Sequence, residues 1–232
     1  MKRASSIGKG MGRAIALSVL LFSLILSCTR DAYEKGEGTY SLMRADLVEA
    51  HVRNDSLIDH IITDDGDQLT LTIPRKQSWV KKCDTLYRAL FYYNKKENKQ
   101  AEVISSTMIN TMNIVPVDSV KKGMKTDPIK LESMWIGNNK RFLNVGLYLK
   151  TGQSTDAKAL HRLGIVCDSI QTNTDGTRTL CARFYHDQGG IPEYYSARTY
   201  LSIPLYNLTT DSLQLTVQTY DGIVTKRFAI ER

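Results

Sequence analysis

Hydrophobic and polar residues alternate over most of this 232-residue chain from Thr39 onward. The alternation is cleanest in residues 69–73, where threonines separate Leu, Leu and Ile, and Pro74 then ends the pattern. A period of two residues puts the hydrophobic side chains on one face of a β-strand. Turn-forming pairs such as Asp65-Gly66 and Asp221-Gly222 divide the pattern into short segments. Since no segment keeps a helical period, the sequence predicts an all-β fold.

The expected strands form two groups on either side of residues 118–127. This stretch holds three lysines, is poor in apolar residues and is followed by Pro128, a composition typical of a linker. Residues 39–117 contain about five strands and a lysine-rich loop, which suits a small OB-like Greek-key barrel. Residues 128–232 contain about seven strands and suit an immunoglobulin-like β-sandwich. The strands are expected at residues 40–52, 57–62, 69–73, 85–93, 101–112, 114–117, 129–136, 142–149, 160–170, 179–185, 195–205, 213–219 and 224–230.

The first 28 residues have the features of a bacterial export signal. Four basic residues and no acid precede an apolar run, Ala14–Leu26, of 13 residues. A helix that spans a membrane needs about 20 residues, so this short run suits a secretory signal instead. We therefore expect residues 1–27 to be a signal peptide that is removed. The alternative is an uncleaved anchor.

The end of the signal resembles a bacterial lipobox. In Ile25-Leu26-Ser27-Cys28 a small residue precedes a cysteine, whose sulfur would be diacylated before the chain is cut in front of it. Leu26 departs from the small residue usual at that position, and a chance cysteine after an ordinary signal is the alternative. We predict lipidation at Cys28, with palmitate as an acyl chain, and a polar tether over residues 28–38. Thr29 rather than Asp follows the cysteine, which by the rule of enteric bacteria predicts the outer membrane, facing the periplasm or the cell surface.

The basic charge of the chain belongs partly to the signal. Removing its four basic residues lowers the formal net charge from +7 to +3, so the charge gives little support for a nucleic-acid partner. Lysines and aromatic residues of the expected barrel could still bind single-stranded nucleic acid or an oligosaccharide, and an oligosaccharide suits the envelope better. We expect no nucleic acid and an unknown protein or glycan ligand. The residues concerned are Lys76, Lys81, Lys82, Lys95, Lys96, Lys99, Tyr87, Phe91, Tyr92 and Tyr93.

Three cysteines follow the predicted lipidation site, namely Cys83, Cys167 and Cys181. An odd number leaves at least one thiol unpaired or paired between chains. Cys167 and Cys181 flank a turn at Asn173–Gly176. A loop centred on its second residue would place the two cysteines directly opposite each other, whereas a two-residue turn would place Cys167 opposite Phe184. Because buried free cysteine is common, we expect three free, mostly buried thiols.

Acidic and histidine residues offer candidate metal ligands, but none has the spacing of a known site. The aspartates lack the twelfth-position glutamate of an EF-hand and fit a solvated turn. The histidines include no short-spaced pair, and one lies among apolar residues. We therefore expect no metal and no cofactor. The candidates are Asp64, Asp65, Asp67, His51, His60, His161 and His186.

Motifs of nucleophilic catalysis are missing from the sequence. Neither Gly-x-Ser-x-Gly nor Cys-x-x-Cys occurs, so we expect a protein that is not an enzyme. A catalytic site assembled in space from distant residues stays open as an alternative. Four tyrosines near the Gly189-Gly190 loop are expected to alternate into the sandwich core, with an exposed contact surface as the alternative. They are Tyr185, Tyr194, Tyr195 and Tyr200.

Asp followed by Ser or Thr and then an aliphatic residue occurs five times. The pattern resembles the acceptor motif for O-glycosylation of exported proteins in some Gram-negative bacteria. The competing explanation is that Asp and Ser mark turns and an aliphatic residue then begins a strand. Of the five hydroxyls, the one in the expected linker is the most accessible. They are Ser56, Thr85, Ser119, Ser169 and Ser212.

The order of parts, with a lipobox, an OB-like domain and a C-terminal β-sandwich, resembles the NigD-like lipoproteins of Gram-negative anaerobes. Short echoes occur in residues 54–73, Met134–Gly137 and Leu160–Leu163. The resemblance implies the fold and the envelope. The family takes its name from a bacteriocin operon, in which one member was proposed as the immunity protein. We expect a membrane-anchored envelope lipoprotein that acts as a binding or protective module. The alternatives are a bacteriocin immunity protein and an envelope enzyme, and the oligomeric state stays open.

Overall fold

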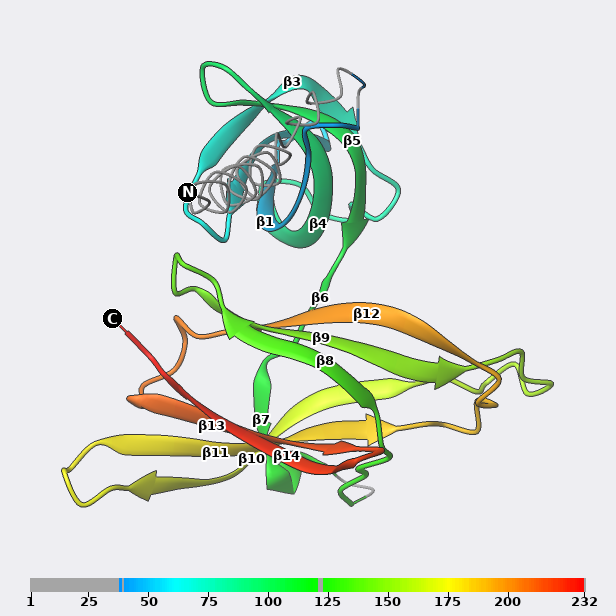
Figure 1. Cartoon of the computed structure of the whole chain (residues 1–232), viewed down its shortest axis with the longest axis vertical. Coiled ribbons are helices and arrows are strands. Elements are labelled where there is room, and N and C mark those ends of the chain that lie inside the picture. The colour runs from blue at the N-terminus through cyan, green and yellow to red at the C-terminus, as the bar shows by residue number, and fades with distance from the viewer. Residues whose placement is uncertain (1–37, 39, 121–122, 232) are drawn as a thin grey trace, which may run out of the picture. The chain divides into compact units, whose positions relative to one another are not determined.

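The computed structural model of the chain describes residues 38, 40–120 and 123–231. The predicted signal, Cys28 and all of the predicted tether except Gly38 lie outside the described residues. The residues from Leu42 onward form one compact unit built almost wholly from β-strands (Figure 1). In the described part of the chain the one helical element is a 3₁₀ turn, η1 (Val117–Ser119). No described segment is a helix of the length and apolar character needed to cross a membrane.

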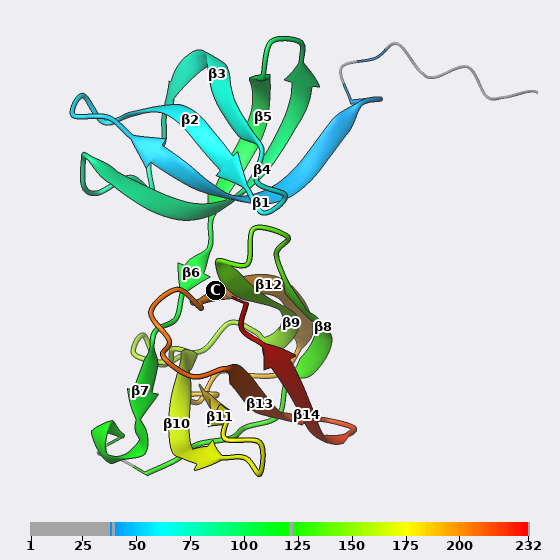
Figure 2. The same ribbon diagram turned by 90° about the vertical axis from the view of Figure 1, so that its left-hand side faces the viewer.

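Five strands close into a barrel in the first part of this unit (Figure 2). They neighbour one another in the order β1-β2-β3-β5-β4, and parallel pairing of β3 with β5 completes the ring. Alternate residues point inward, so that Ala89, Phe91 and Tyr93 of β4 are fully buried. The structure confirms the small barrel expected from the alternation. The strands are β1 (Met43–Val52), β2 (Leu57–Thr63), β3 (Gln68–Lys76), β4 (Thr85–Lys96) and β5 (Gln100–Met108).

Two sheets form a β-sandwich in the second part. One sheet has the order β14-β13-β11-β10-β7 and the other β6-β12-β9-β8. Three of the pairings, β7 with β10, β11 with β13 and β6 with β12, are parallel. The predicted two-sheet sandwich is therefore confirmed. The strands are β6 (Asn110–Thr111), β7 (Ile114–Pro116), β8 (Lys130–Ile136), β9 (Phe142–Thr151), β10 (Arg162–Thr172), β11 (Arg178–Asp187), β12 (Tyr195–Pro204), β13 (Ser212–Thr219) and β14 (Gly222–Ala229).

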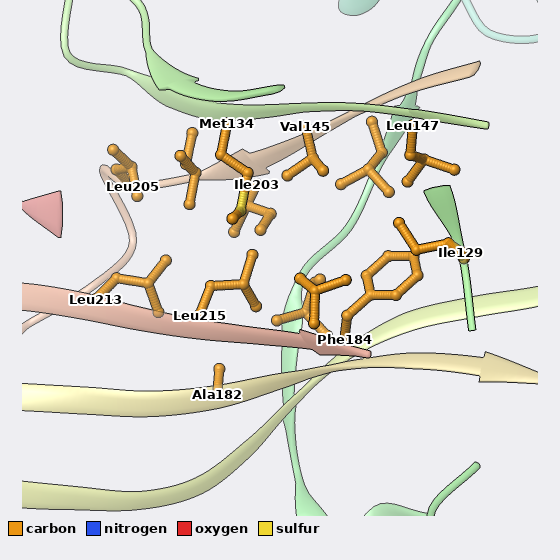
Figure 3. Packing of buried hydrophobic residues seen from close by; sticks show 14 of the residues in the cluster. Ile129, Met134, Val145, Leu147, Ala182, Phe184, Ile203, Leu205, Leu213 and Leu215 are labelled. Atoms are coloured by element: carbon orange, nitrogen blue, oxygen red, sulfur yellow. The ribbon is translucent and has the colours of Figure 1, made fainter. Parts of the chain in front are cut away.

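The sandwich core lies between the inner faces of the two sheets. Figure 3 shows Val145 and Leu147 on one side facing Leu215 and Phe184 on the other. In β9 the alternation expected from the sequence places leucine and valine inward, and Leu143, Val145 and Leu147 are fully buried. The residues that alternate with them along β9 therefore point to the outer face of the sheet.

The chain enters the sandwich earlier than the composition suggests. We expected residues 114–117 to close the barrel and residues 118–127 to be a linker. Instead β6 pairs with β12 and β7 pairs with β10, so both short strands belong to the sandwich. Ile114 packs against the sandwich core. The described residues of the polar stretch that follows are mostly exposed and connect strands within the sandwich. A solvated connection of this kind has the same composition as a linker between domains.

The hairpin of β10 and β11 adopts neither of the two expected cysteine registers. Cys167 lies opposite Ala182 and Ser169 lies opposite Cys181, because a β-bulge at Asp168 shifts the register by one residue. The three cysteines of the described residues are free, as expected. The expectation that most are buried is wrong, since Cys83 is exposed and the other two are half-buried.

A buried polar network joins the barrel to the sandwich. Arg88 of β4, which is 5% exposed, donates from Nη2 to Asp64 Oδ2 at 2.6 Å and to Asn144 Oδ1 at 3.0 Å. Its Nε donates to Ser202 Oγ at 3.0 Å, and Asn144 Nδ2 donates to Asp64 Oδ2 at 2.7 Å. The guanidinium also lies 4.3 Å from the centroid of the Phe142 ring. A buried charge is tolerated only with such partners, so the network fixes where β4 meets the sandwich.

The loop between β8 and β9 adds a second set of contacts to the barrel. Arg141 pairs with the buried Glu49 through two hydrogen bonds of 2.6 and 3.0 Å. The Asn139 backbone N–H donates to the Asp64 carbonyl at 2.8 Å. At Gly137 a Cβ would lie 2.8 Å from Asp64 Cγ, so only glycine allows the loop to approach so closely. The barrel and the sandwich are thus held in one arrangement by specific polar contacts.

Candidate functional site

A cleft of ≈ 370 Å³ lies between the barrel and the outer face of the sheet β6-β12-β9-β8. Its barrel side comes from β1, β4 and the turn between β2 and β3, and its sandwich side from β8 and β12. This volume lies at the small end of the range for sites that bind small molecules. The lining residues are Ala45, Asp46, Leu47, Asp64, Asp65, Leu90, Tyr92, Trp135, Arg198 and Tyr200.

Two aromatic rings form the sandwich side of the cleft. The rings of Trp135 and Tyr200 meet edge to face, with centroids 6.3 Å apart. Tyr200 lies opposite Gly146 in the pairing of β12 with β9. A Cβ at Gly146 would lie 3.0 Å from Tyr200 Cε1, so the glycine leaves the space in which the tyrosine ring lies across the sheet. Both rings are half-buried and keep part of their surface open to a ligand.

Arg198 places a fixed cation beside these rings. Its guanidinium carbon lies 4.9 Å from the centroid of Tyr200. The Nε and Nη2 atoms donate to the two carboxylate oxygens of Glu132 at 2.8 and 2.7 Å. Glu132 has no opposite residue in β9 because a bulge falls between Leu131 and Ser133. The hydrogen bond to Glu132 raises the pKa of Arg198 further above its ordinary value, so the cation persists at every physiological pH.

Acidic side chains line the barrel side of the cleft, and each already has a partner. Asp46 accepts a hydrogen bond from the Tyr93 hydroxyl at 2.6 Å and pairs with Arg44 at 3.1 Å. Burial of Tyr93, together with this hydrogen bond, raises the pKa of the phenol well above its usual range. Asp65 accepts from Asn138 Nδ2 at 2.8 Å. Each of these carboxylates therefore has a nearby donor, and the charged side chains that line the cleft are three aspartates and Arg198.

The arrangement suits a ligand that is rich in hydroxyl groups and uncharged. Aromatic faces such as those of Trp135 and Tyr200 pack against apolar faces of a ligand. Charged side chains around them, such as Arg198 and Asp65, offer donors and acceptors whose positions are fixed by their own partners. A sugar ring presents both an apolar face and a rim of hydroxyls. The geometry of the cleft thus combines the two features that carbohydrate recognition needs.

The lysines and aromatic residues that we proposed as a barrel surface do not form a single site. Phe91 and Tyr93 are fully buried in the barrel, whereas Tyr92 points the other way and lines the cleft. The Tyr87 hydroxyl accepts hydrogen bonds from the backbone N–H groups of Lys81 and Lys82 at 2.9 and 2.7 Å. These residues border a separate, apolar hollow of ≈ 430 Å³ that also contains Trp79.

The four tyrosines of the sandwich are distributed differently from our expectation of a buried cluster. Tyr194 is 79% and Tyr195 60% exposed, and Tyr185 is half-buried. None of the four belongs to the sandwich core, and only Tyr200 reaches the cleft. The expectation is wrong because Tyr185 and Tyr200 take outward positions of β11 and β12, whereas Tyr194 lies in the loop before β12 and Tyr195 is its first residue. Tyrosine tolerates such partial exposure.

The aspartates and histidines considered as metal ligands fall into separate groups. Asp64 joins the network around Arg88, while Asp65 and Asp67 bind basic and amide side chains such as Arg44 and Lys95. His161 and His186 form a pair with their ring nitrogens 3.0 Å apart. His51 and His60, nine residues apart in the sequence, come together on the barrel with Asp59.

The five candidate glycosylation sites differ in accessibility. Ser119 and Ser169 are exposed, and Ser56 and Thr85 are half-buried. Ser212 is only 5% exposed, and its hydroxyl already contacts Thr179 Oγ1 at 2.9 Å and accepts from Arg227 Nε at 3.0 Å. A glycan on Ser212 would have to displace these contacts in the folded protein. The structure therefore narrows the candidates to the exposed and half-buried hydroxyls.

Sequence reasoning missed Trp135 and Arg198 as site residues. Trp135 was noted only as part of Met134–Gly137, a short segment that resembles the family. Arg198 was only one residue of an expected strand. A usable signal was present, because the alternation in β9 predicts that Gly146 faces outward. An outward glycine in the middle of a strand indicates close approach by another group, here the ring of Tyr200.

The fold defines a class of two-domain β proteins in which a small closed barrel precedes a two-sheet sandwich. The sequence profile described as "NigD-like C-terminal beta sandwich domain" matches residues 113–229. The chain therefore belongs to the NigD-like family, as its resemblance predicted. The matched segment begins just before β7, which agrees with the assignment of that strand to the sandwich. No match was found among curated proteins.

Solved structures with similar folds come from Bacteroides and Parabacteroides species. A NigD-like immunity protein from Bacteroides caccae is 25% identical, with a TM-score of 0.67 over 81% of this chain and 98% of its own. A candidate toxin-related protein from Parabacteroides distasonis is 19% identical, with a TM-score of 0.60 over 80% of this chain and 92% of its own. A candidate lipoprotein from Bacteroides fragilis is 12% identical, with a TM-score of 0.57 over 82% of this chain and 98% of its own.

Proposed function

We propose that the protein is a lipid-anchored envelope protein that binds a neutral glycan in the cleft between barrel and sandwich. The observation that carries the proposal is the pair of rings, Trp135 and Tyr200, set beside the charged groups Arg198 and Glu132. A binding role rather than catalysis agrees with the partners of the cleft carboxylates. Asp46 and Asp65, two of the three aspartates of the cleft, are both engaged by donors.

Intrinsic fluorescence gives a direct test, because the chain holds only two tryptophans and one lies in the cleft. In a Trp79→Phe background the emission reports Trp135 alone. We expect a neutral oligosaccharide from a screen of envelope and extracellular glycans to shift this emission in a saturable way. Trp135→Phe or Tyr200→Ala should weaken binding, followed by calorimetry, at least about tenfold, or 1.4 kcal/mol.

Tyr194→Ala is the matched control for these variants, since Tyr194 is an exposed tyrosine outside the cleft. It should bind the same oligosaccharide as tightly as the unchanged protein. If no glycan in the screen binds, or if Trp135→Phe and Tyr200→Ala bind as well as Tyr194→Ala, the proposal is wrong.

Attachment to the outer membrane through Cys28 is part of the same proposal. It rests on the lipobox-like Ile25–Cys28, on the short apolar run that leads into it and on the basic residues before that run. Several acyl chains at about 0.8 kcal/mol per buried methylene would make a stable anchor. A protein held at the envelope would meet glycans at the membrane surface on either side of the outer membrane.

A second candidate function is immunity to a bacteriocin. The 25% sequence identity to a NigD-like immunity protein from Bacteroides caccae favours it. In this case the partner is a protein toxin, and a deletion strain should become sensitive to one cognate toxin and otherwise grow normally. Expression of the unchanged chain should restore resistance. A deletion strain that resists every bacteriocin of neighbouring strains would count against this function.

We further propose O-glycosylation at one or more of the hydroxyls Ser56, Thr85, Ser119 and Ser169. Ser119 and Ser169 are the best placed, since both are exposed. The intact mass of the protein from its native host should exceed that of peptide plus lipid by whole glycan units, and Ser119→Ala together with Ser169→Ala should remove most of the excess. A mass equal to peptide plus lipid would contradict the proposal.

A further inference from the structure

Three potential metal ligands meet on the outer surface of the barrel. His51 of β1 lies directly opposite His60 of β2 in the antiparallel pairing. Nδ1 of His51 lies 2.9 Å from Asp59 Oδ1, and Nδ1 of His60 lies 2.8 Å from the same oxygen. The two imidazole rings are stacked, with centroids 4.3 Å apart and planes inclined by 21°. One donor atom from each residue therefore points to a common place.

A β-bulge explains why adjacent residues Asp59 and His60 share a face. Val52 pairs with Ile58 and His51 pairs with His60, so Asp59 has no opposite residue in β1. The residue left over in a bulge turns its side chain away from strict alternation. Ile58 and Ile61 on either side of the pair are fully buried and anchor the strand in the barrel core. The backbone thus holds Asp59 outward beside His60.

The donor set has the composition of a site for a transition metal ion. Two imidazoles and a carboxylate are ligands of zinc sites that keep a further position open for water. The three donor atoms lie within 4.8 Å of one another. Tetrahedral zinc with bonds of about 2.0–2.1 Å places its ligand atoms about 3.3 Å apart, so small rotations of half-buried side chains suffice. Each imidazole would keep its proton on Nε2 and offer Nδ1 to the metal.

The neighbouring strands present no charge opposite the cluster. His51 lies opposite Leu86 in the pairing of β1 with β4, and His60 lies opposite Thr70 in the pairing of β2 with β3. The Asp59 carboxylate has no Lys or Arg partner among the ion pairs of the described residues, and its partners there are the two histidines. In most other ion pairs of the barrel the carboxylate is paired with a Lys or Arg side chain. An entering cation would therefore replace hydrogen bonds from the two imidazoles and not an ion pair with Lys or Arg.

From this geometry we propose that His51, Asp59 and His60 form a binding site for one divalent transition metal ion, with Zn²⁺ as the probe. The side chains are 34%, 27% and 39% exposed, so an ion can enter from solvent. The site lies on barrel strands that do not line the glycan cleft at these positions, and it is independent of the function proposed above.

Calorimetric titration of the full chain with ZnCl₂ in detergent tests the proposal. A Cys83→Ser background removes the exposed thiol of the described residues, which could bind zinc on its own. We expect one equivalent of zinc to bind. His51→Gln, His60→Gln and Asp59→Asn should each weaken binding at least about tenfold. His161→Gln, which changes a histidine of the other pair, should bind zinc as the background does.

Titration with CoCl₂ adds a readout that a merely structural role of the cluster would not change. Bound cobalt should give visible ligand-field absorption that shifts or disappears in the His51→Gln and His60→Gln variants. Circular dichroism checks that each variant is folded, and Asp59→Asn, the smallest change, serves if a histidine variant fails to fold. Absence of zinc binding, or equal binding by the three variants and the background, would show a hydrogen-bonded surface cluster only and overturn the proposal.

Discussion

His161 and His186 bring two imidazoles into ring-nitrogen contact on the sandwich. His186 is 1% exposed, and its Nδ1 donates to the Asp127 carbonyl at 2.9 Å. Its Nε2 is then left to accept from His161 Nδ1 at 3.0 Å. Burial, and secondly the neighbouring His186, lower the pKa of His161 below its ordinary value.

This pair predicts that the folded state loses stability in mild acid. A histidine whose pKa is lower in the folded than in the unfolded state binds more protons after unfolding. The free energy of unfolding should therefore fall as the pH drops below about 6.5, the ordinary histidine pKa. Urea denaturation at pH 7.5 and at pH 5.5 measures the change. His161→Gln keeps a donor for His186 but cannot titrate, so its stability should depend less on pH. Identical pH dependence in both proteins would contradict the prediction.

The contribution of an ion pair to the free energy of unfolding of this protein depends on how deeply the pair is buried. Arg88 is buried and shares Asp64 with Asn144, so Arg88→Met leaves a half-desolvated carboxylate without its cation. Breaking a buried pair in this way costs about 3–5 kcal/mol. Urea denaturation should show a loss of this size. Arg183→Met is the control, because its pair with Asp168 is joined by two hydrogen bonds but lies at the surface. It should cost about 1 kcal/mol or less, and equal losses in the two variants would refute the argument.

Among the elements, β6 and β7 are short, but each covers one edge of a sheet of the sandwich. β6 pairs with the edge of β12 and β7 pairs with the edge of β10. Met112 and Ile114, between and within them, pack against the sandwich core. Exposed strand edges and uncovered apolar residues favour aggregation. Although β6 and β7 contain few residues, they therefore shield strand edges and apolar side chains of the sandwich from contacts that lead to aggregation.

A comparison of two fragments tests this role. A fragment of residues 110–232 should fold cooperatively, because it retains both short strands. A fragment of residues 118–232, which begins at the boundary suggested by composition, should aggregate or melt at a clearly lower temperature. Thermal unfolding followed by circular dichroism, with size-exclusion chromatography, measures both. Equal melting temperatures and monomeric behaviour of the shorter fragment would show that β6 and β7 are dispensable.

The sequence predicted the elements better than their connections. Alternation identified nearly every strand, since the inward positions of β4 and β9 must be apolar for the barrel and the sandwich to have cores. The assignment of Ile114–Pro116 could not be predicted, because a three-residue strand has the same local pattern in either domain. Its partner β10 is distant in the sequence. The register at Cys167 depended on a bulge, which leaves no mark in the period-two pattern.

Both candidate sites depend on similar long-range features. The His51 and His60 pair follows from the register of β1 against β2, and Asp59 joins it only through a second bulge. The cleft needs the barrel and the sandwich in one arrangement, which the Arg88 network and the Arg141–Glu49 pair provide. Sequence spacing alone carries no information on such contacts. The outward glycine Gly146 was the one local feature that pointed toward a site.

For the whole molecule, the decisive question is whether a lipid on Cys28 holds the folded unit at the envelope, as proposed above. The proposal of lipidation predicts that the protein incorporates labelled palmitate in its native host. Cys28→Ala should abolish this label, whereas Cys83→Ala, which removes an exposed thiol of the folded part, should leave it unchanged. Label that persists in Cys28→Ala would contradict lipidation at Cys28. Absence of label from both variants and from the unchanged protein would contradict it as well.

If the chain is anchored in the outer membrane as proposed, the side of that membrane that the cleft faces decides which glycans it can meet. Residues 28–41, fourteen in number, precede the compact unit that begins at Leu42, and even a fully extended chain of this length reaches only about 50 Å. A ligand must therefore come close to the membrane surface. Protease treatment of intact cells, with a periplasmic protein as control, should cleave the chain if the cleft faces outward. Extracellular glycans or incoming toxins are then the ligands to compare in the Trp135→Phe assay. If cleavage requires that the outer membrane be opened first, the ligand is periplasmic, and short glycans of the cell wall become the appropriate test.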